Sequence, residues 1–396
     1  MDFQLTEDQI TTRKWIHEFA EKEIRPVAAE YDESEEFPWP VIKKAAEIGL
    51  YSMEFYTDLV MGDPTGLLLP IAQEETCWGC AGISLGIWGP GLPLSALAYS
   101  ATPDQLLKFA PMMFGTPEDP KTGAFCVTEP NAGSDVSALR TTAKRDGDEW
   151  VLNGQKVFIT NGGIASVHIV VATVDHELGH RGQAAFIIGP DTPGISQGKK
   201  ERKMGIRASH TAEVLLNDCR IPLENVVGGM DRLESKLERA RSKDPSRTSA
   251  ALKTFEMTRP SVAAQALGIA RAAFEYSLDY AKERRAFGRP IVEHQGIAFK
   301  LADMALEIDA ARLLTWRAAW LSRNGTFEHA EGSMSKLKAS EVAVWVTEQA
   351  VQILGGYGYI KDFPVEKWYR DAKIYTLFEG TSEIQRIVIS RALATA

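Results

Sequence analysis

The period of the hydrophobic residues changes twice along the chain, and this change constrains the fold more than any other feature. Apolar residues recur at helical spacing in residues 6–29 and 38–50. From Ala124 the chain becomes a series of short β-rich runs, and after Pro222 helix-forming residues return. We therefore predict an α+β multidomain chain with an N-terminal all-α domain (1–123), a middle antiparallel β-barrel or sandwich domain (124–229) and a C-terminal four-helix bundle (230–396).

Turn and periodicity signals place individual elements within this frame. Asp146-Gly147 and Asn153-Gly154 are typical of hairpin turns between strands. One face of a long helix is marked by four apolar residues at helical spacing: Ile297, Leu301, Met304 and Ile308. The other expected elements are strands at 167–174, 183–188 and 212–216 and helices at 340–354 and 381–393.

Charge and the first residues limit the possible partners. The chain has 396 residues and a net charge of -9 without any basic block, which argues against nucleic acid or an anionic membrane surface. It starts without the regions of a signal peptide and enters a capping box, Thr6 with Gln9, so we expect a cytoplasmic protein. The uncharged stretch 76–103 is long enough to cross a bilayer, but its Gly-Pro-rich centre favours a buried helical layer with a turn and no stable membrane association.

Two short motifs match catalytic patterns but stand in the wrong context. CWGC at 77–80 has the spacing of a redox dithiol, yet nothing before it reads as the strand that such sites require. HELGH at 176–180 fits the zinc-protease pattern, but it falls between two predicted strands where a hairpin turn belongs. We therefore expect no redox dithiol and no metal site. The four cysteines form no disulfide framework, which fits a reducing compartment.

Glu379 is a carboxylate in an apolar stretch, and it is our candidate for the reacting group. Leu377 and Phe378 would desolvate its charged form and raise its pKa, while Gly380 would let backbone amides approach a ligand. That combination suits a general base beside an amide donor. The structural alternative is a helix N-cap at Thr381 followed by a first-turn glutamate.

Two predicted strands end in polar segments that suit a ligand. Residues 125–135 (FCVTEPNAGSD) offer backbone amides and hydroxyls for phosphates or the polar edge of a flavin, although such a segment can also be only a turn. Residues 158–163 (FITNGG) place an aromatic face beside a hydroxyl at another strand end. No GxGxxG segment opens a βαβ unit, so a dinucleotide would not be held in the Rossmann manner.

The longer motifs together resemble the acyl-CoA dehydrogenase family over nearly the whole chain. The likeness starts with LTEDQ at 5–9 and includes TEPNAGSD at 128–135 and LNGQKVFITN at 152–161. The further matching motifs are KMG at 203–205 with Ser209 and Thr211, ERRAFG at 283–288, QILGG at 352–356, RDAKI at 370–374 and FEGT at 378–381. Because all these motifs occur in the order and at the separations seen in the family, together they are far more specific than any one of them.

The resemblance implies an FAD-dependent acyl-CoA dehydrogenase, an oxidoreductase of fatty acid β-oxidation and lipid metabolism. Glu379 matches the family's catalytic base, which removes the α proton of an acyl-CoA thioester while hydride passes from Cβ to flavin N5 and a trans-2-enoyl product forms. In the family, the amide of the base and a flavin ribose hydroxyl donate hydrogen bonds to the thioester oxygen. The resemblance also implies an electron-transferring flavoprotein as acceptor and a homotetramer built as a dimer of dimers.

The resemblance also implies binding roles for further residues, each at a position that matches a functional position of the family. Phe158 stands where the family commonly has Trp, and Glu383 where glutamine is frequent. The implied FAD contacts are Phe125, Val127, Thr128, Gly133, Ser134, Phe158, Ile159, Thr160, Thr381 and Glu383. Contacts to the FAD of a neighbouring subunit are implied for Arg284, Phe287, Gln295, Gln352, Ile353, Leu354, Gly355 and Gly356, and substrate contacts for Ser134, Phe255, Glu256, Arg259, Phe378 and Gly380.

The position of the base and two departures from the family pattern bear on the substrate. Some branched-chain and long-chain members keep the base on the helix that contains Thr258 rather than in the C-terminal segment, so the glutamate at 379 favours a short- or medium-chain type of site. The family's Pro-Glu-Glu-Tyr-Gly-Gly stretch is replaced by FYTD at 55–58 and an apolar run at 66–72, which would reshape one pocket wall. A charged insertion, 231–250, reads as a solvated surface helix and loop; alternatively Arg239, Arg241, Lys243 or Arg247 contacts the CoA phosphates or a carrier protein.

Two alternatives from other functional classes remain. One is a flavin-dependent monooxygenase or oxidase on the same fold, which the presence of Glu379 and the chain length disfavour. The other is a subunit of a hetero-oligomer that keeps the fold but has lost the base or the FAD contacts, and this chain has both.

Overall fold

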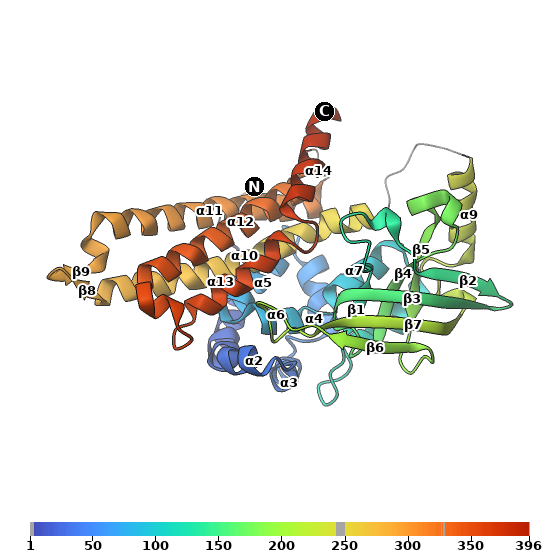
Figure 1. The fold of residues 1–396 in the computed structure, drawn as a ribbon, viewed down its shortest axis with the longest axis horizontal. Helices are drawn as coiled ribbons and strands as arrows, with labels where there is room; N and C mark the ends of the chain where they lie inside the picture. The colour runs from blue at the N-terminus through green and yellow to red at the C-terminus, as the bar shows by residue number, and fades with distance from the viewer. Residues whose placement is uncertain (1–3, 243–249, 326, 328, 396) are drawn as a thin grey trace.

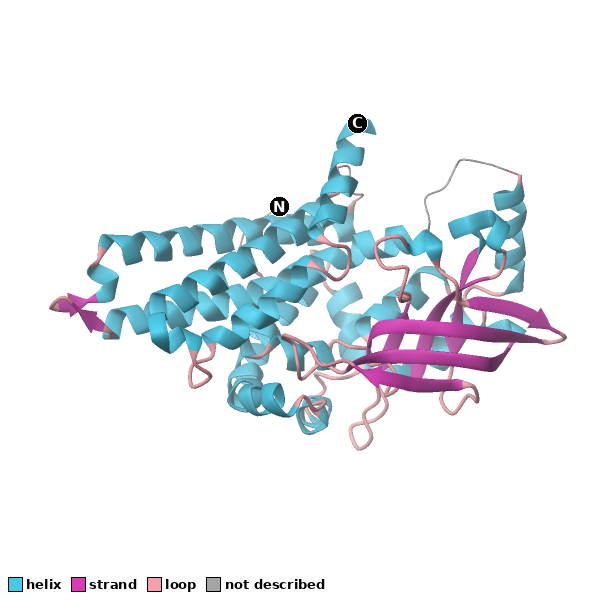
Figure 2. Ribbon diagram, in the orientation of Figure 1, coloured by secondary structure: helices cyan, strands magenta, loops and turns pink. Residues whose placement is uncertain are grey.

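Helices occupy the two ends of the sequence and strands its middle, as predicted (Figures 1 and 2). The computed structural model describes residues 4–242, 250–325, 327 and 329–395. The strands of the middle segment, 123–222, gather at one end of the molecule, the long C-terminal helices extend toward the other, and the N-terminal helices lie along the junction (Figure 1). The predicted fold class is therefore confirmed.

The N-terminal segment begins with the predicted capping box. The Gln9 N–H donates to Thr6 Oγ1 over 3.2 Å, and the Thr6 N–H donates to Gln9 Oε1 over 3.0 Å. The single helix predicted for 6–29 is divided, because Pro26 has no N–H with which to continue the helical ladder. The elements are α1 (Glu7–Phe19), η1 (Ala20–Ile24), η2 (Arg25–Val27), α2 (Ala28–Ser34), α3 (Trp39–Glu47), α4 (Met53–Thr57), η3 (Asp58–Gly62), α5 (Leu68–Gly79), α6 (Ala81–Ile87), α7 (Gly91–Ser100), α8 (Pro103–Phe109) and η4 (Pro111–Met113).

The uncharged stretch 76–103 contains the end of α5 and all of α6 and α7. The predicted break at its Gly-Pro-rich centre is confirmed, because α6 ends at Ile87 and α7 begins at Gly91. Among the described residues, no single helix is long and apolar enough to cross a membrane, and α6 and α7 pass such a test only as a pair bent by 40°.

The strands of the middle segment form one seven-stranded sheet in the order β1-β4-β2-β3-β7-β6, with β5 also paired to β4. The sheet is mixed rather than antiparallel throughout, because β1 runs parallel to β4 and one residue pair joins β2 to β4 in the same sense. The strands are β1 (Gly123–Cys126), β2 (Thr142–Asp146), β3 (Glu149–Thr160), β4 (Val167–Thr173), β5 (Gln183–Ile188), β6 (Ile195–Lys200) and β7 (Thr211–Pro222), with short helical turns η5 (Val136–Ala138), η6 (His176–Gly182) and η7 (Leu223–Asn225).

One of the two predicted hairpin turns is confirmed and the other is wrong. Asp146-Gly147 joins the antiparallel strands β2 and β3. Asn153-Gly154 lies inside β3 at a register shift, and a Cβ on Gly154 would stand 2.5 Å from Thr141 Oγ1. The glycine therefore serves a bulge and a close contact rather than a turn. HELGH falls on η6, between the antiparallel strands β4 and β5, so the turn predicted there is confirmed.

The C-terminal part is a bundle of α10, α11, α12 and α13, and α5 packs against α10. The predicted inner face of α11 is confirmed, because Leu301, Met304 and Ile308 are buried. The elements are α9 (Met230–Arg241), α10 (Ala250–Glu283), β8 (Arg285–Ala286), β9 (Arg289–Pro290), η8 (Ile291–Glu293), α11 (Gln295–Asn324), α12 (Glu331–Leu354), η9 (Gly355–Tyr359), α13 (Val365–Lys373), η10 (Ile374–Thr376) and α14 (Ser382–Thr395).

The charged insertion begins with α9, which is anchored to the β domain rather than fully solvated. Leu233 and Leu237 are buried in the same apolar cluster as the strands. Arg241 pairs with Asp175 over 3.1 Å, and Arg239 donates to a carbonyl of its own helix. Lys243 and Arg247 lie outside the described residues, so contact between the insertion and CoA stays a prediction.

Candidate active site

A cavity of about 630 Å³ collects residues from all three parts of the chain. Its walls come from N-terminal helices, from the ends of β1 and β3, from α10 and from the loop before α14. The predicted FAD and substrate residues that line it are Phe125, Val127, Thr128, Gly133, Ser134, Phe158, Ile159, Thr160, Arg259, Phe378, Glu379 and Gly380.

Glu379 is held in the cavity wall by the loop between η10 and α14. Its backbone has a left-handed φ of 54°, an uncommon conformation for a residue with a side chain. Gln385 Nε2 fixes the loop by donating to the carbonyls of Glu379 (3.0 Å) and Gly380 (2.9 Å), and Lys336 Nζ donates to the latter over 2.6 Å. Thr381 does cap α14, but Glu379 precedes the cap, so its side chain is not needed to start the helix.

Burial raises the pKa of Glu379 to about 7. The charges of Arg259 and Lys336 and a hydrogen bond from Thr258 lower the pKa, but they offset the burial only in part. Burial also lowers the pKa of Lys336, to about 8. The pKa of Glu379 thus lies near neutral pH, where a carboxylate is best suited to exchange protons as a general base.

Thr258, on α10, faces Glu379 across the cavity wall. Its Oγ1 donates to Glu379 Oε2 over 3.3 Å. Arg259, the next residue, is buried and donates to Ser333 Oγ on α12. The two positions at which a carboxylate was considered from the sequence therefore adjoin in space.

The end of β3 presents an aromatic face to the cavity. Phe158 has a left-handed φ of 59° at a register shift between β3 and β7, and its side chain is 65% exposed. A bulge that turns a large apolar ring out of a sheet needs a partner for that ring. A planar aromatic ligand beside Phe158 and Thr160 fits this requirement.

A buried ion pair supports the neighbouring loop after β1. Lys156 Nζ donates to Glu129 Oε1 over 2.7 Å and to the Val127 carbonyl over 2.9 Å. Glu129 also accepts the N–H groups of Arg140 (2.6 Å) and Thr141 (3.0 Å). These bonds tie residues 127–141 to β3 and leave Gly133 open, since a Cβ there would meet nothing within 4 Å.

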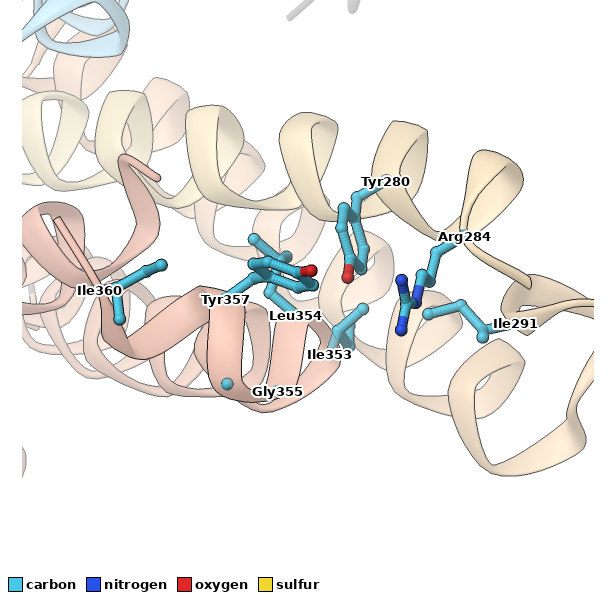
Figure 3. A pocket seen from close by; sticks show the side chains of 9 residues that line it. Tyr280, Arg284, Ile291, Ile353, Leu354, Gly355, Tyr357 and Ile360 are labelled. Carbon is cyan, nitrogen blue, oxygen red and sulfur yellow. The ribbon is translucent and has the colours of Figure 1, made fainter. Parts of the chain in front are cut away.

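A second cavity, of about 460 Å³, lies in the bundle and shares no lining residue with the first (Figure 3). Arg284 points into it beside Tyr280 and Ile291, and its guanidinium lies 5.7 Å from the centre of the Tyr357 ring (Figure 3). Five residues predicted to contact a neighbouring subunit's FAD line this cavity: Arg284, Ile353, Leu354, Gly355 and Gly356. Within one chain, the predicted FAD residues are therefore divided between two places.

Those of the remaining predicted residues whose side chains the structure describes lie outside both cavities. Phe287, at the tip of the β8–β9 turn, is 96% exposed, and Gln295 and Gln352 are exposed at the ends of α11 and α12. Thr381 and Glu383 start α14. The side chains of Phe255 and Glu256 lie outside what the structure describes.

The CWGC cysteines are buried in the helical core. Burial raises the pKa of Cys77 to about 12, and Lys367 donates to Cys80 Sγ over 3.3 Å. A thiol with so high a pKa is a poor nucleophile at neutral pH, in agreement with the prediction of no redox dithiol.

Sequence reasoning missed several groups that hold the site in place. Lys336 and Ser333 lie on the buried face of α12, and Gln385 lies on that of α14. Lys336 could have been found from the sequence, because a lysine on the apolar stripe of a helix predicts a buried charge that needs a partner inside the protein. Lys156 could have been found in the same way, since it lies among apolar residues of a predicted strand.

Comparisons with known proteins agree with this architecture. Models of the acyl-CoA dehydrogenase N-terminal, middle and C-terminal domains match residues 6–115, 124–219 and 248–394. The mitochondrial short-chain specific acyl-CoA dehydrogenase of Rattus norvegicus is 42% identical over 391 residues, 98% of this chain and 90% of that protein. The short-chain specific acyl-CoA dehydrogenase of Clostridium acetobutylicum is 40% identical over 98% of this chain and 99% of that protein.

Solved structures give the same result. Butyryl-CoA dehydrogenase from Megasphaera elsdenii superposes with a TM-score of 0.89 at 38% identity, over all of both chains. Fold and site thus define an oxidoreductase with a desolvated carboxylate beside a cofactor-sized cavity. The chain belongs to the acyl-CoA dehydrogenase family, and it is an acyl-CoA dehydrogenase.

Proposed function

We propose that the enzyme oxidises a short-chain type of acyl-CoA thioester to the trans-2-enoyl-CoA, with Glu379 as the base that removes the α proton. The observation that carries the proposal is the placement of Glu379, whose pKa burial raises to about 7, in the wall of a cavity that also holds the exposed face of Phe158. Relatives named as short-chain specific enzymes support the substrate class.

The first cavity fits FAD through residues of the β domain. The exposed ring of Phe158 and the hydroxyl of Thr160 would stand at the flavin ring, and the amides and hydroxyls of Thr128, Gly133 and Ser134 would hold its polar groups. When bound, FAD supplies the two-electron acceptor for the hydride that leaves Cβ.

The loop of Glu379 supplies both a base and an amide donor. Its carboxylate takes the α proton, and the positive charges of Arg259 and Lys336 keep part of it ionised before the reaction. In the described structure, the N–H groups of Glu379 and Gly380 make no hydrogen bond, so they are available to the thioester oxygen as negative charge develops there. Each such donor typically contributes ~3 kcal/mol to the transition state.

A hydrogen bond to Glu379 should set the pH dependence of the reaction. Thr258→Val removes a donor that favours the charged carboxylate, so the pKa of Glu379 should rise above about 7. Because only the charged form accepts the α proton, the rising limb of kcat/KM against pH should move to higher pH, with wild type and variant converging in alkali. A pH profile of kcat/KM measures this; an unmoved or acid-shifted limb would show that Thr258 does not tune the base.

The homotetramer and the electron acceptor are also parts of the proposal. Two separated sets of predicted FAD residues suit an assembly in which one chain completes the site of another. A structure solved in work on the electron transferring flavoprotein of Acidaminococcus fermentans is 39% identical with a TM-score of 0.89, which supports such a flavoprotein as the acceptor. The cytoplasmic location stays a prediction from the sequence.

Anaerobic absorbance spectra of the purified protein test the proposal. The flavin band should bleach on addition of a short-chain acyl-CoA from a panel of short, medium and branched thioesters. A bound flavin that no acyl-CoA bleaches would favour the monooxygenase or hetero-oligomer alternative. A protein that binds no flavin, even with added FAD, would contradict the cofactor assignment.

A further inference from the structure

The wall of the first cavity that the N-terminal helices build is apolar except at a few places, and Gln73 is the most unusual of them. Gly66, Leu69, Pro70 and Gln73 follow one another at helical spacing, at the start of α5 and just before it, and all four line the cavity. Gln73 is only 4% exposed. Gln73 is thus largely enclosed by the protein at the wall of the space that a ligand fills.

The amide of Gln73 lacks hydrogen-bond partners within the described residues. Its Oε1 is buried without one, and no bond of its Nε2 is found there either. Most buried side-chain amides are paired, since leaving one unpaired in an apolar surrounding is unfavourable. An amide left unpaired at a cavity wall is therefore expected to pair with what enters the cavity.

The position of Gln73 favours the acyl group over the cofactor as that partner. The residues that fit FAD lie at the strand ends, whereas Gln73 belongs to the helical wall. That wall contains mostly apolar side chains, which suit a carbon chain: Leu59, Leu69, Leu85, Trp88 and Leu92. A leucine or methionine at position 73 would complete such a wall for a hydrocarbon, and the chain has an amide instead.

We propose that Gln73 is a specificity-determining residue that hydrogen-bonds an oxygen on the acyl group, a hydroxyl or carbonyl beyond Cβ. The inference rests on the proposed function. Cα and Cβ must both carry hydrogen for the dehydrogenation, so the oxygen lies at Cγ or further along the chain. A hydroxyl oxygen accepts a hydrogen bond from Nε2, and a methyl group of similar size cannot. The enzyme then selects hydroxyacyl thioesters over plain alkyl thioesters of the same size.

Matched thioesters test this selection, because a hydroxyl and a methyl group have similar size. The probes are 4-hydroxybutyryl-, 5-hydroxypentanoyl- and 6-hydroxyhexanoyl-CoA, each paired with the acyl-CoA in which a methyl replaces the hydroxyl. At one of these lengths, kcat/KM should be at least about tenfold higher for the hydroxyl compound, because the methyl compound leaves the amide unpaired. In Gln73→Leu the preference should reverse, with FAD content and the spectrum of the bound flavin unchanged.

Gln265 provides the matched control. It is a second buried glutamine that lines the same cavity, but its Oε1 accepts a hydrogen bond from Tyr375 over 3.4 Å. Gln265→Leu should therefore keep the wild-type preference, whatever it does to the melting temperature. KM and kcat should also be measured separately for Gln73→Leu. A change in KM with kcat unchanged would show that Gln73 contacts the substrate equally in the ground state and the transition state.

The outcomes separate this inference from the proposed function. If wild type and Gln73→Leu show the same ratio, or wild type prefers the methyl compounds at every length, the inference is wrong while the dehydrogenase stands. If Gln73→Leu loses FAD, the amide serves the cofactor and the inference is wrong as well. If no thioester of either kind bleaches the flavin, the proposed function itself fails.

Discussion

Glu379→Gln should lower the rate of acyl-CoA-dependent flavin reduction by about 10²- to 10⁴-fold. Among the residues described at the first cavity, Glu379 is the only carboxylate, so no neighbouring group can take over the proton. Glutamine has the same shape and can still pair with Thr258, which leaves the loop and the cavity in place. Anaerobic stopped-flow recording of the flavin band measures the rate, and an unchanged spectrum before mixing shows that the cofactor site is intact.

Moving the carboxylate to Thr258 provides a control that tests geometry as well as chemistry. Because Thr258 Oγ1 lies 3.3 Å from Glu379 Oε2, a glutamate at position 258 reaches the same part of the cavity. The double variant Thr258→Glu, Glu379→Gly should recover part of the rate that Glu379→Gly alone loses. A Glu379→Gln enzyme that reduces its flavin at nearly the wild-type rate would place the base elsewhere.

The order of domains could be predicted because it follows from the period of apolar residues, a local property of the sequence. The partners of strands are not local. A short apolar run such as β1 gives no sign that its neighbour will be β4 in parallel orientation, since that depends on how the whole sheet closes. The same limit explains the wrong prediction at Gly154. The glycine of this turn-like dipeptide is required by the close approach of Thr141, which lies on another segment.

The candidate base was predictable and its environment was not. Glu379 could be found from its apolar neighbours, which desolvate it by proximity in sequence. The groups that moderate its pKa, Thr258, Arg259 and Lys336, come from α10 and α12 and meet it only when the bundle forms. Gln73 likewise looks ordinary in the sequence, and it becomes informative only when its amide is seen without a partner.

A buried ion cluster makes the bundle's attachment to the N-terminal helices the most sensitive place for stability. Arg271, on α10, is 7% exposed and donates to Glu74 over 2.9 Å and to Glu75 over 2.7 Å, both on α5. Arg13 and His17 of α1 reach Glu75 from the other side, each at 2.7 Å. Arg271, Glu74 and Glu75 are thus paired away from water, whereas Arg13 and His17 reach Glu75 from the partly exposed side of α1.

Arg271→Met should destabilise the FAD-saturated enzyme by about 3–5 kcal/mol, because it leaves buried Glu75 without its main partner and Glu74 with Arg312 alone, while nearly keeping the volume of the side chain. Arg220→Met is the matched control: that arginine is about half exposed and also bridges two carboxylates, Asp146 and Glu149, and its loss should destabilise the protein far less, because water solvates the charges that it leaves. Urea unfolding of both variants and wild type, at one protein concentration, gives the comparison.

The pH dependence of this effect has a definite sign. In wild type, hydrogen bonds and charge from Arg271 hold the pKa of Glu75 below its ordinary value despite burial, so the stability from the cluster is present at neutral pH and is lost as the pH falls through the acid range. In Arg271→Met, Arg13 and His17 still pair with Glu75, but burial is opposed less and the pKa of Glu75 should rise, so protonation as the pH falls should relieve part of the unpaired charge. The stability gap between the two proteins should therefore narrow from pH 7.5 to pH 5, and a gap that stays constant would mean that lost packing, not unpaired charge, causes the destabilisation.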